Sequence, residues 1–99
     1  MRISFLPIAQ KELDEAFSWY EEQVVGLGYE FLDELDQSIR LISSFPESFL
    51  QIKDSIRCCL INRFPYNIIY GIEEHEIIVI AIAHQKREPN YWVERKKIL

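Results

Sequence analysis

The sequence predicts an α+β fold: an N-terminal strand and a helix hairpin packed on a small antiparallel β-sheet, with a short C-terminal helix or tail. Over residues 9–44, apolar side chains recur every three or four positions, which is typical of amphipathic helices. Three apolar runs then follow between Ile56 and His84, broken by Pro65 and by a polar turn, which is typical of strands. A chain of 99 residues is expected to form one domain, residues 1–99.

The first half of the chain is predicted to hold one strand and two helices. The apolar segment Arg2–Leu6 precedes a proline and is expected to be an edge strand. The helical pattern starts at Ala9 and should end at the Gly26–Gly28 turn, because glycine readily takes the left-handed conformation found at helix ends. A second helix is expected over about residues 29–44, ending before Pro46. Together they should form an antiparallel hairpin.

The second half is predicted to hold a loop, a strand meander and a tail. Residues 45–55 are expected to form the loop, with three apolar side chains packed against the core: Phe45, Phe49 and Leu50. Strands are expected at about residues 56–64, 66–72 and 77–84. The run Ile77–Ala83 is apolar on both faces, so it should be a central strand covered on one side by the helices. Either the C-terminal segment Pro89–Leu99, which starts like a helix, or a partner chain should cover the other face.

Charge is distributed unevenly along the chain, whose formal net charge is −5. Residues 9–54 hold eleven acidic and three basic residues, whereas residues 55–99 hold five acidic and seven basic residues. The mildly basic second half favours contact with a polyanion or an acidic partner. The acidic first half is interpreted as solvated helix surface.

Composition and cysteine usage restrict the class of protein. No apolar stretch reaches the roughly 18 residues of a membrane span, so no membrane contact is expected. The N-terminus is too soon polar for a signal peptide, and a cytoplasmic location is the expectation. The neighbours Cys58 and Cys59 should not pair with each other, and on a strand they would face opposite ways. With two histidines and no further cysteine, we expect no metal and no cofactor.

The segment from Arg57 to Trp92 carries a resemblance to a known family. It reads Phe64-Pro65-Tyr66-x-Ile68-x-Tyr70-x-Ile72, then the apolar run Ile77–Ala83, then His84, Lys86-Arg87, Pro89 and Tyr91-Trp92. With its order of strand, acidic helix pair and meander, nearly the whole chain resembles the RelE/ParE superfamily of type II toxin–antitoxin, or plasmid stabilisation, systems. The resemblance implies two helices on a small antiparallel sheet and a cognate antitoxin partner.

The resemblance leaves two targets open, because RelE-like members cleave messenger RNA in the ribosome and ParE-like members inhibit DNA gyrase. In the RNA-cleaving branch, an arginine follows the position of Tyr66 and braces the scissile phosphate; here that position is Asn67, which carries no charge. The lysines or other general base of the preceding strand are replaced by residues 58–60. Arg87 and Tyr91 do match the pattern. We therefore expect a ParE-like gyrase inhibitor; the alternatives are a ribosome-dependent endoribonuclease and a degenerate member that only binds its antitoxin.

If the chain is a nuclease, the resemblance and the residue chemistry name His84, Arg87 and Tyr91 as the catalytic residues. His84 would act as general acid for the leaving 5′ oxygen, since imidazole titrates near neutrality. The alternative interpretation is a half-buried histidine that hydrogen-bonds a loop where its strand ends.

Target or antitoxin binding is expected to use a basic and aromatic surface, made of Arg57, Arg63, Tyr66, Lys86, Arg87, Tyr91 and Trp92. Arg57 and Arg63 are six residues apart, so on a regular strand they would share a face and could form a basic patch. Alternatively, each arginine pairs with a glutamate of the acidic helices. The aromatic rings could stack on bases, whereas core packing is the other interpretation of Trp92. An antitoxin segment should bind across the apolar surface left by the sheet and tail, in a homodimer or a toxin–antitoxin hetero-oligomer.

Overall fold

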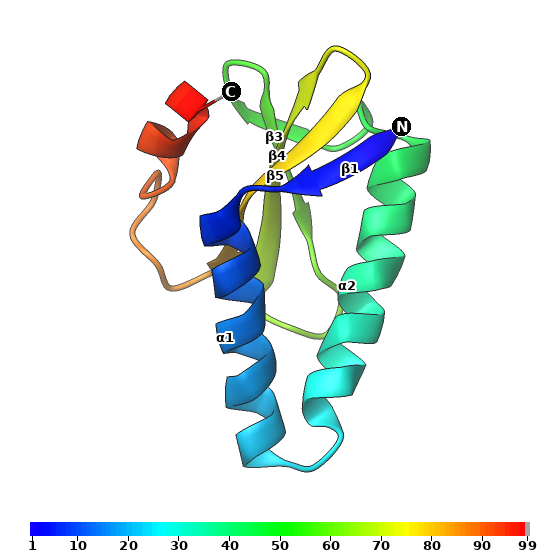
Figure 1. Ribbon diagram of the computed structural model, residues 1–99, viewed down its shortest axis with the longest axis vertical. Helices are drawn as coiled ribbons and strands as arrows, with labels where there is room; N and C mark the ends of the chain where they lie inside the picture. Colours follow the sequence, from blue (N-terminus) through cyan, green and yellow to red (C-terminus); the bar gives the residue numbers. More distant parts are fainter. Residues whose placement is uncertain (99) are drawn as a thin grey trace.

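The computed structural model describes the backbone of residues 1–98 and the side chains of residues 1–96. The elements in order are β1 (Arg2–Phe5), α1 (Pro7–Gln23), α2 (Leu27–Ser44), β2 (Leu50–Lys53), β3 (Ile56–Leu60), β4 (Tyr66–Glu73), β5 (Glu76–His84) and the 3-10 helix η1 (Val93–Ile98). The helix hairpin packs on the sheet, and the C-terminal segment runs back beside the start of α1 (Figure 1). This confirms the predicted α+β fold, including its short C-terminal helix.

The sheet has the strand order β1-β5-β4-β3-β2. Strands β2 to β5 pair antiparallel, but β1 runs parallel to β5, so the sheet is mixed rather than wholly antiparallel. β1 precedes both helices, and its direction is therefore free of the hairpin turns that make consecutive strands antiparallel. The apolar run Ile77–Ala83 lies inside the sheet, between β1 and β4, as its two-sided apolar pattern predicts.

Both helices start earlier than their predicted bounds. α1 begins at Pro7, because proline is well suited to a first helical turn. α2 begins directly after Gly26, which takes the left-handed conformation with φ +92°. The carboxylate of Glu21 accepts hydrogen bonds from the backbone N–H groups of Gly26 and Gly28, each at 2.9 Å. At Gly28 a β-carbon would lie 2.8 Å from the carbonyl oxygen of Phe17, so only glycine fits this close approach.

The loop predicted over residues 45–55 contains a strand, β2. All four of its residues are exposed, and it is held by backbone pairing with β3 at the edge of the sheet. Leu50 and Phe45 are exposed rather than packed against the core, which corrects that prediction, while Phe49 does pack there. Leu50 and Ile52 alternate with Gln51 and Lys53, which is the period of a strand, so a short signal was present that the loop prediction did not use.

The strand predicted to run to Phe64 ends at Leu60. The next residues turn the chain, and Ile61 N–H donates to the carbonyl oxygen of Tyr66 at 2.9 Å. Arg63 lies in this turn with φ +72°. Arg63 therefore does not share a strand face with Arg57, and the prediction of a shared face is wrong.

The C-terminal segment covers part of the sheet face that points away from the helices. Trp92 is buried there, beside Asn67 and Ala83.

Cys59 is buried and Cys58 is half-buried; both are free, and burial raises the pKa of both thiols. Among the described residues, no helix combines the length and the apolar character needed to span a membrane.

Candidate functional site

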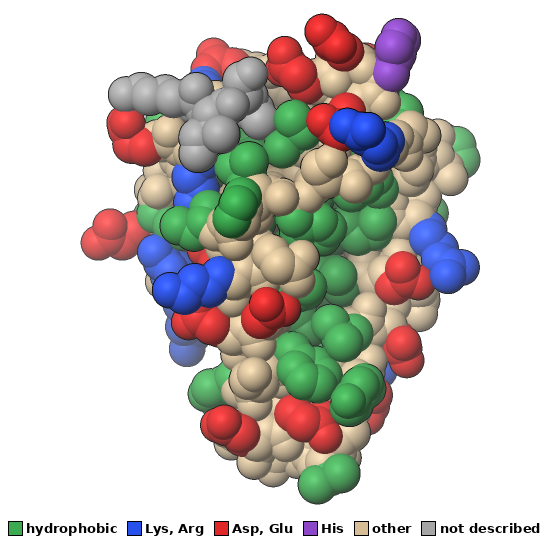
Figure 2. All heavy atoms as spheres, viewed as in Figure 1, with side chains coloured by type: hydrophobic (Ala, Val, Ile, Leu, Met, Phe, Trp, Pro, Cys, Tyr) green, Lys and Arg blue, Asp and Glu red, His purple; other side chains and the backbone are tan. Residues whose placement is uncertain are grey.

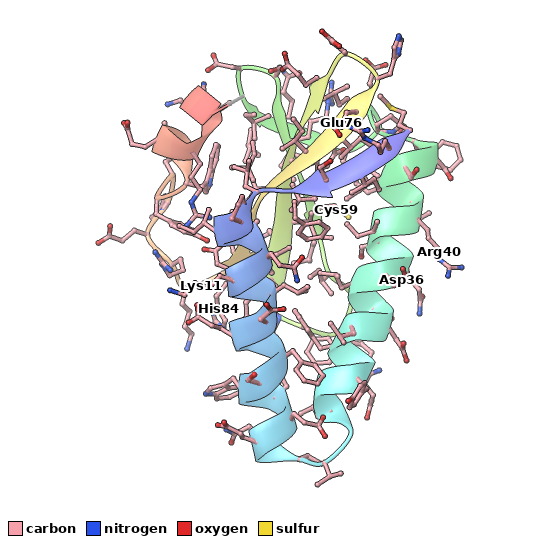
Figure 3. All side chains as sticks on the ribbon, viewed as in Figure 1. Lys11, Asp36, Arg40, Cys59, Glu76 and His84 are labelled. Carbon is pink, nitrogen blue, oxygen red and sulfur yellow. The ribbon has the colours of Figure 1, made fainter. Side chains whose placement is uncertain are left out.

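A cavity of about 380 Å³ opens where α1 passes the ends of β4 and β5. α1 contributes Glu12, Glu15, Ala16 and Trp19; the strands contribute Tyr66, Ile82 and His84; the following segment contributes Arg87 and Tyr91. Figure 3 shows the His84 side chain on the α1 side of the molecule. Four of the predicted site residues are thus brought together: Tyr66, His84, Arg87 and Tyr91.

Strand register places two of these side chains face to face. Tyr66 is the first residue of β4 and His84 the last of β5, and they are direct cross-strand partners. Their rings meet edge to face, with centroids 4.9 Å apart, a favourable arrangement for aromatic pairs. Burial raises the pKa of the Tyr66 phenol.

His84 is fixed by the turn that follows it. Its Nδ1 accepts a hydrogen bond from the backbone N–H of Lys86 at 3.0 Å, and its carbonyl oxygen accepts one from the N–H of Arg87 at 3.0 Å. Because Nδ1 is an acceptor here, a neutral His84 ring carries its proton on Nε2. The loop contact expected of a strand-ending histidine is therefore present.

Glu12 is the hub of the site. Its carboxylate accepts a hydrogen bond from the Tyr91 hydroxyl at 2.7 Å, bonds from Arg95 Nη1 and Nη2 at 2.8 and 3.1 Å, and one from the backbone N–H of Ile82 at 3.0 Å. Arg95 Nη1 also donates to the carbonyl oxygen of Ile80 at 3.1 Å. The side chains of Glu12 and Arg95 are only 14% and 13% exposed.

Strand geometry explains why these two side chains meet. β1 ends opposite Val79, so beyond that point this edge of β5 pairs with no strand of the described chain. On its other side β5 carries a bulge, because Ile69 pairs with Ala81 while Tyr70 pairs with Val79, which leaves Ile80 without a partner in β4. Glu12 and Arg95 thus satisfy backbone groups of an unpaired strand edge.

The hub fixes the protonation of its neighbours. Burial, and then the hydrogen bond to the Glu12 carboxylate, raise the pKa of Tyr91 well above the ordinary tyrosine value. Tyr91 therefore stays a protonated donor near neutral pH. Burial lowers the pKa of Arg95, but the hydrogen bond and charge of Glu12 outweigh it, so the net pKa is raised and the guanidinium stays charged.

Tyr91 is also a platform for cations. The guanidinium of Arg87 lies 3.8 Å from the centroid of the Tyr91 ring, and that of Arg95 lies 5.0 Å from it. Both distances are within the range of cation–π attraction. Arg87 is therefore positioned against Tyr91, although the residue remains exposed.

The remaining predicted residues lie elsewhere. Arg57 donates to the carbonyl oxygen of Phe49 at 2.8 Å, and Arg63 forms an ion pair with Glu30 of α2 at 2.7 Å. The shared basic patch is thus wrong, and the pairing with an acidic helix is confirmed for Arg63. Lys86 is exposed and does not line the cavity. Trp92 is buried, which contradicts a role as an exposed binding residue and agrees with core packing.

Sequence reasoning missed Glu12, which it assigned to the solvated helix face. A signal was present: Glu12 lies three residues after Ala9 and four before Ala16, both buried, so helical spacing places all three on one side. Trp19, further along the same helix, is 56% exposed and borders the cavity.

Asn67 lies on the opposite side of the sheet from the cavity. It follows Tyr66 in β4, and successive strand residues face opposite ways. It lines a separate cavity of about 180 Å³ under the C-terminal segment.

Among the described side chains, no three histidine, cysteine, aspartate or glutamate residues gather as a metal site would require.

Comparison with known proteins supports the same assignment of fold. The structure is similar to the chromosomal ParDE toxin–antitoxin system from P. aeruginosa, with TM-score 0.72 and 13% identity over 85% of this chain and 95% of that chain. It is also similar to the isolated E. coli RelE toxin, with TM-score 0.61 and 18% identity over 99% of this chain and 98% of that chain. No curated protein matches the sequence at a significant level.

The family assignment comes from the sequence match. Residues 3–89 match the family described as ParE toxin of type II toxin–antitoxin system, parDE. The match covers most of the 99 residues, including both helices, strands β2 to β5 and all of β1 except its first residue. The chain therefore belongs to the ParE toxin family of type II toxin–antitoxin systems.

Proposed function

We propose that this toxin acts by binding and inhibiting DNA gyrase, not by cleaving RNA, and that a cognate antitoxin neutralises it. One observation carries the proposal: the side chains that would serve a nuclease are held in contacts within the protein. The Tyr91 hydroxyl donates a hydrogen bond to the Glu12 carboxylate, and Arg87 lies on the Tyr91 ring. A gyrase target also implies the cytoplasmic location expected from the sequence.

The chemistry of RNA cleavage argues in the same direction. The reaction needs a base, an acid and a cation that stabilises the charge building on phosphorus. The raised pKa of Tyr91 makes it unsuited as a base. The residue at the phosphate-bracing position, Asn67, is neutral and faces away from the cavity. Glu15, an exposed carboxylate that forms no ion pair with the described residues, lines the cavity, where it would repel a phosphate.

Two assays on one preparation test the proposal. We expect inhibition of gyrase-catalysed DNA supercoiling and no cleavage of ribosome-bound messenger RNA. Inhibition should weaken in Arg87→Ala and Lys86→Ala, which remove charges near the cavity. Arg40→Ala is the matched control, since Arg40 is exposed on α2 and, among the described side chains, forms its ion pair with Asp36, at 3.0 Å (Figure 3).

Codon-specific RNA cleavage that His84→Ala or Arg87→Ala abolishes would overturn the proposal in favour of the ribosome-dependent nuclease. Inactivity in both assays, with antitoxin binding retained, would instead favour the degenerate, antitoxin-binding alternative.

For the antitoxin, we propose the apolar sheet surface that the C-terminal segment leaves uncovered. Leu50 is the register partner of Cys58, and Leu60 is two residues further along β3, so all three share a face. Cys59, between the last two, faces α2, where Ser38 hydrogen-bonds its thiol. Leu50 and Leu60 are both exposed at a sheet edge, where an added strand or an amphipathic helix could bind.

Co-expression with the short protein encoded beside the toxin should give a complex that stays together in gel filtration. Leu60→Asp should dissociate it, because a carboxylate would be buried in the apolar contact. Leu41→Asp is the control, since Leu41 is an equally large exposed side chain but lies on α2. Separate elution of the two wild-type proteins, or equal effects of both substitutions, would contradict this surface.

A further inference from the structure

We propose that the Trp19 end of the cavity is a binding site for a cationic side chain, arginine or lysine, presented by a protein partner. The inference deepens the proposed function and rests on it only in that such a toxin acts by binding proteins. The site consists of Trp19, Tyr66 and His84 on one side and Glu15 on the other.

Trp19 is the central feature of this site. Its side chain is 56% exposed although tryptophan is a large apolar residue, and it is held edge to face on Tyr20 with centroids 5.2 Å apart. It borders the main cavity and two further ones. The first, of about 270 Å³, is aromatic and is lined by Trp19, Tyr20, Tyr66 and His84. The second, of about 360 Å³, lies on the outer side of α1. The indole thus separates an aromatic hollow from an acidic one.

The outer cavity supplies the charge. It is lined by Lys11, Asp14, Glu15, Ser18, Trp19 and Glu22, so three carboxylates face one ammonium group. Glu15 borders both this cavity and the main one, is exposed, and forms no hydrogen bond or ion pair with the described residues. The potential at the indole is therefore negative, which attracts a cation and repels an anionic ligand.

An exposed indole next to a free carboxylate matches the chemistry of guanidinium and ammonium recognition. The ring face attracts the cation, and the carboxylate accepts its N–H groups. The protein already makes such a contact at the other end of the cavity, where Arg87 lies 3.8 Å from the Tyr91 ring centroid. Arg87 lines neither of the two smaller cavities around Trp19, so it does not occupy the Trp19 end.

The two tryptophans of the chain allow a direct test. Trp92 is buried beneath the C-terminal segment and serves as an internal reference for Trp19. With ¹⁵N-labelled protein, N-acetyl-arginine methylamide and a short arginine peptide are titrated while the two indole N–H signals are followed by NMR. N-acetyl-citrulline methylamide, a neutral molecule of the same shape, is the matched probe. We expect a saturable shift of the Trp19 signal with the arginine probes only, and a constant Trp92 signal.

Variants identify the groups that bind. Glu15→Gln should weaken binding of the arginine probe by about three- to fivefold, the size expected for one exposed charge pair. Trp19→Leu, which keeps apolar bulk without a ring, should weaken it by about fivefold or more, followed on the Tyr66 and His84 signals. Arg87→Ala should tighten binding, because it removes a like charge from the main cavity, which Trp19 also lines. Arg40→Ala, on α2, should leave binding unchanged.

Three results would overturn the proposal: equal binding of the citrulline probe, no effect of Glu15→Gln, or loss of binding in Arg87→Ala, which would indicate an anion site. Trp19 and Glu15 are exposed, so unchanged circular dichroism should accompany both substitutions. The titration needs neither gyrase nor antitoxin. A failed supercoiling assay therefore leaves this site intact, and a failed titration leaves gyrase inhibition intact.

Discussion

At the scale of single residues, Glu12 lies in an acidic helix, yet its side chain joins that helix to β5 and to the C-terminal segment. It is one of eleven acids over residues 9–54, and nothing in the composition separates it from the others. Its four donors come from β5 and from the C-terminal segment, more than 65 positions away in sequence. Helical spacing could place Glu12 on the buried side of α1, but its partners depend on where β1 stops and on the β5 bulge, which no local pattern reveals.

Removing this charge should destabilise the protein. Glu12→Gln leaves Arg95 almost buried without its counter-charge, so we expect the free energy of unfolding to fall by about 2–4 kcal/mol. Urea denaturation followed by circular dichroism measures the change. Glu15→Gln, one helical turn on and exposed, should change it by less than about 0.5 kcal/mol. Equal losses in the two variants would show that the hub is not the cause.

Tyr70 should give the protein an alkaline limit. Burial raises the pKa of its phenol to about 12, and its hydroxyl donates to the carbonyl oxygen of Pro46 at 2.6 Å. An unfolded tyrosine ionises near pH 10. The stability linked to this raised pKa is therefore fully present below about pH 10 and is lost as the pH rises toward 12. In urea unfolding across this range, Tyr70→Phe should lose less stability with pH than the wild type; parallel curves would contradict the prediction.

At the scale of elements, the parts that bury a continuous apolar surface are the parts that the sequence predicts. The stripes of α1 and α2 and the two-sided run of β5 follow directly from the periods of helices and strands. β2 buries no apolar surface, because its four residues are exposed and are ordered by backbone pairing with β3. Its apolar and polar residues do alternate, but over four positions only. The early end of β3 has a similar origin, since a left-handed Arg63 leaves no apolar signature.

Trp92 should be the main apolar anchor of the C-terminal segment, beside the polar contacts of Tyr91 and Arg95 with Glu12. Trp92 is 4% exposed, so Trp92→Ala should lower the free energy of unfolding by about 3–5 kcal/mol. Trp19→Ala makes the same substitution at the exposed tryptophan and should cost less than about 1 kcal/mol. Hydrogen exchange should also increase across η1 in Trp92→Ala alone. Similar unfolding energies for the two variants would mean that the segment is not anchored by Trp92.

At the scale of the whole molecule, burial is concentrated between the helix pair and the sheet, and charge lies around it. Figure 2 shows hydrophobic side chains gathered along the space between α1 and α2, with acidic and basic groups at the flanks. The basic residues of the second half of the sequence do not form one basic surface in the folded protein. Arg63 pairs with Glu30, Arg95 with Glu12, and Lys96 with Asp54. Candidate residues near each other in the sequence could be grouped correctly, as with His84, Arg87 and Tyr91, but pairing across the fold could not be predicted.

This dispersal of charge predicts that the toxin has little affinity for nucleic acid by itself. Affinity for RNA or DNA grows with the number of phosphates that lysine and arginine neutralise. Here the net charge is −5, and five basic side chains of the described residues are already paired. Fluorescence anisotropy with a labelled RNA strand and a DNA duplex should give dissociation constants weaker than about 10⁻⁴ M at physiological salt. A Glu15→Lys/Glu22→Lys variant, changed at two exposed positions of α1, should bind measurably more tightly and with a steeper salt dependence. Micromolar, strongly salt-dependent binding of RNA by the wild type would contradict the prediction, because it would require a surface of unpaired basic side chains. Such a result would favour the alternative of a ribosome-dependent nuclease.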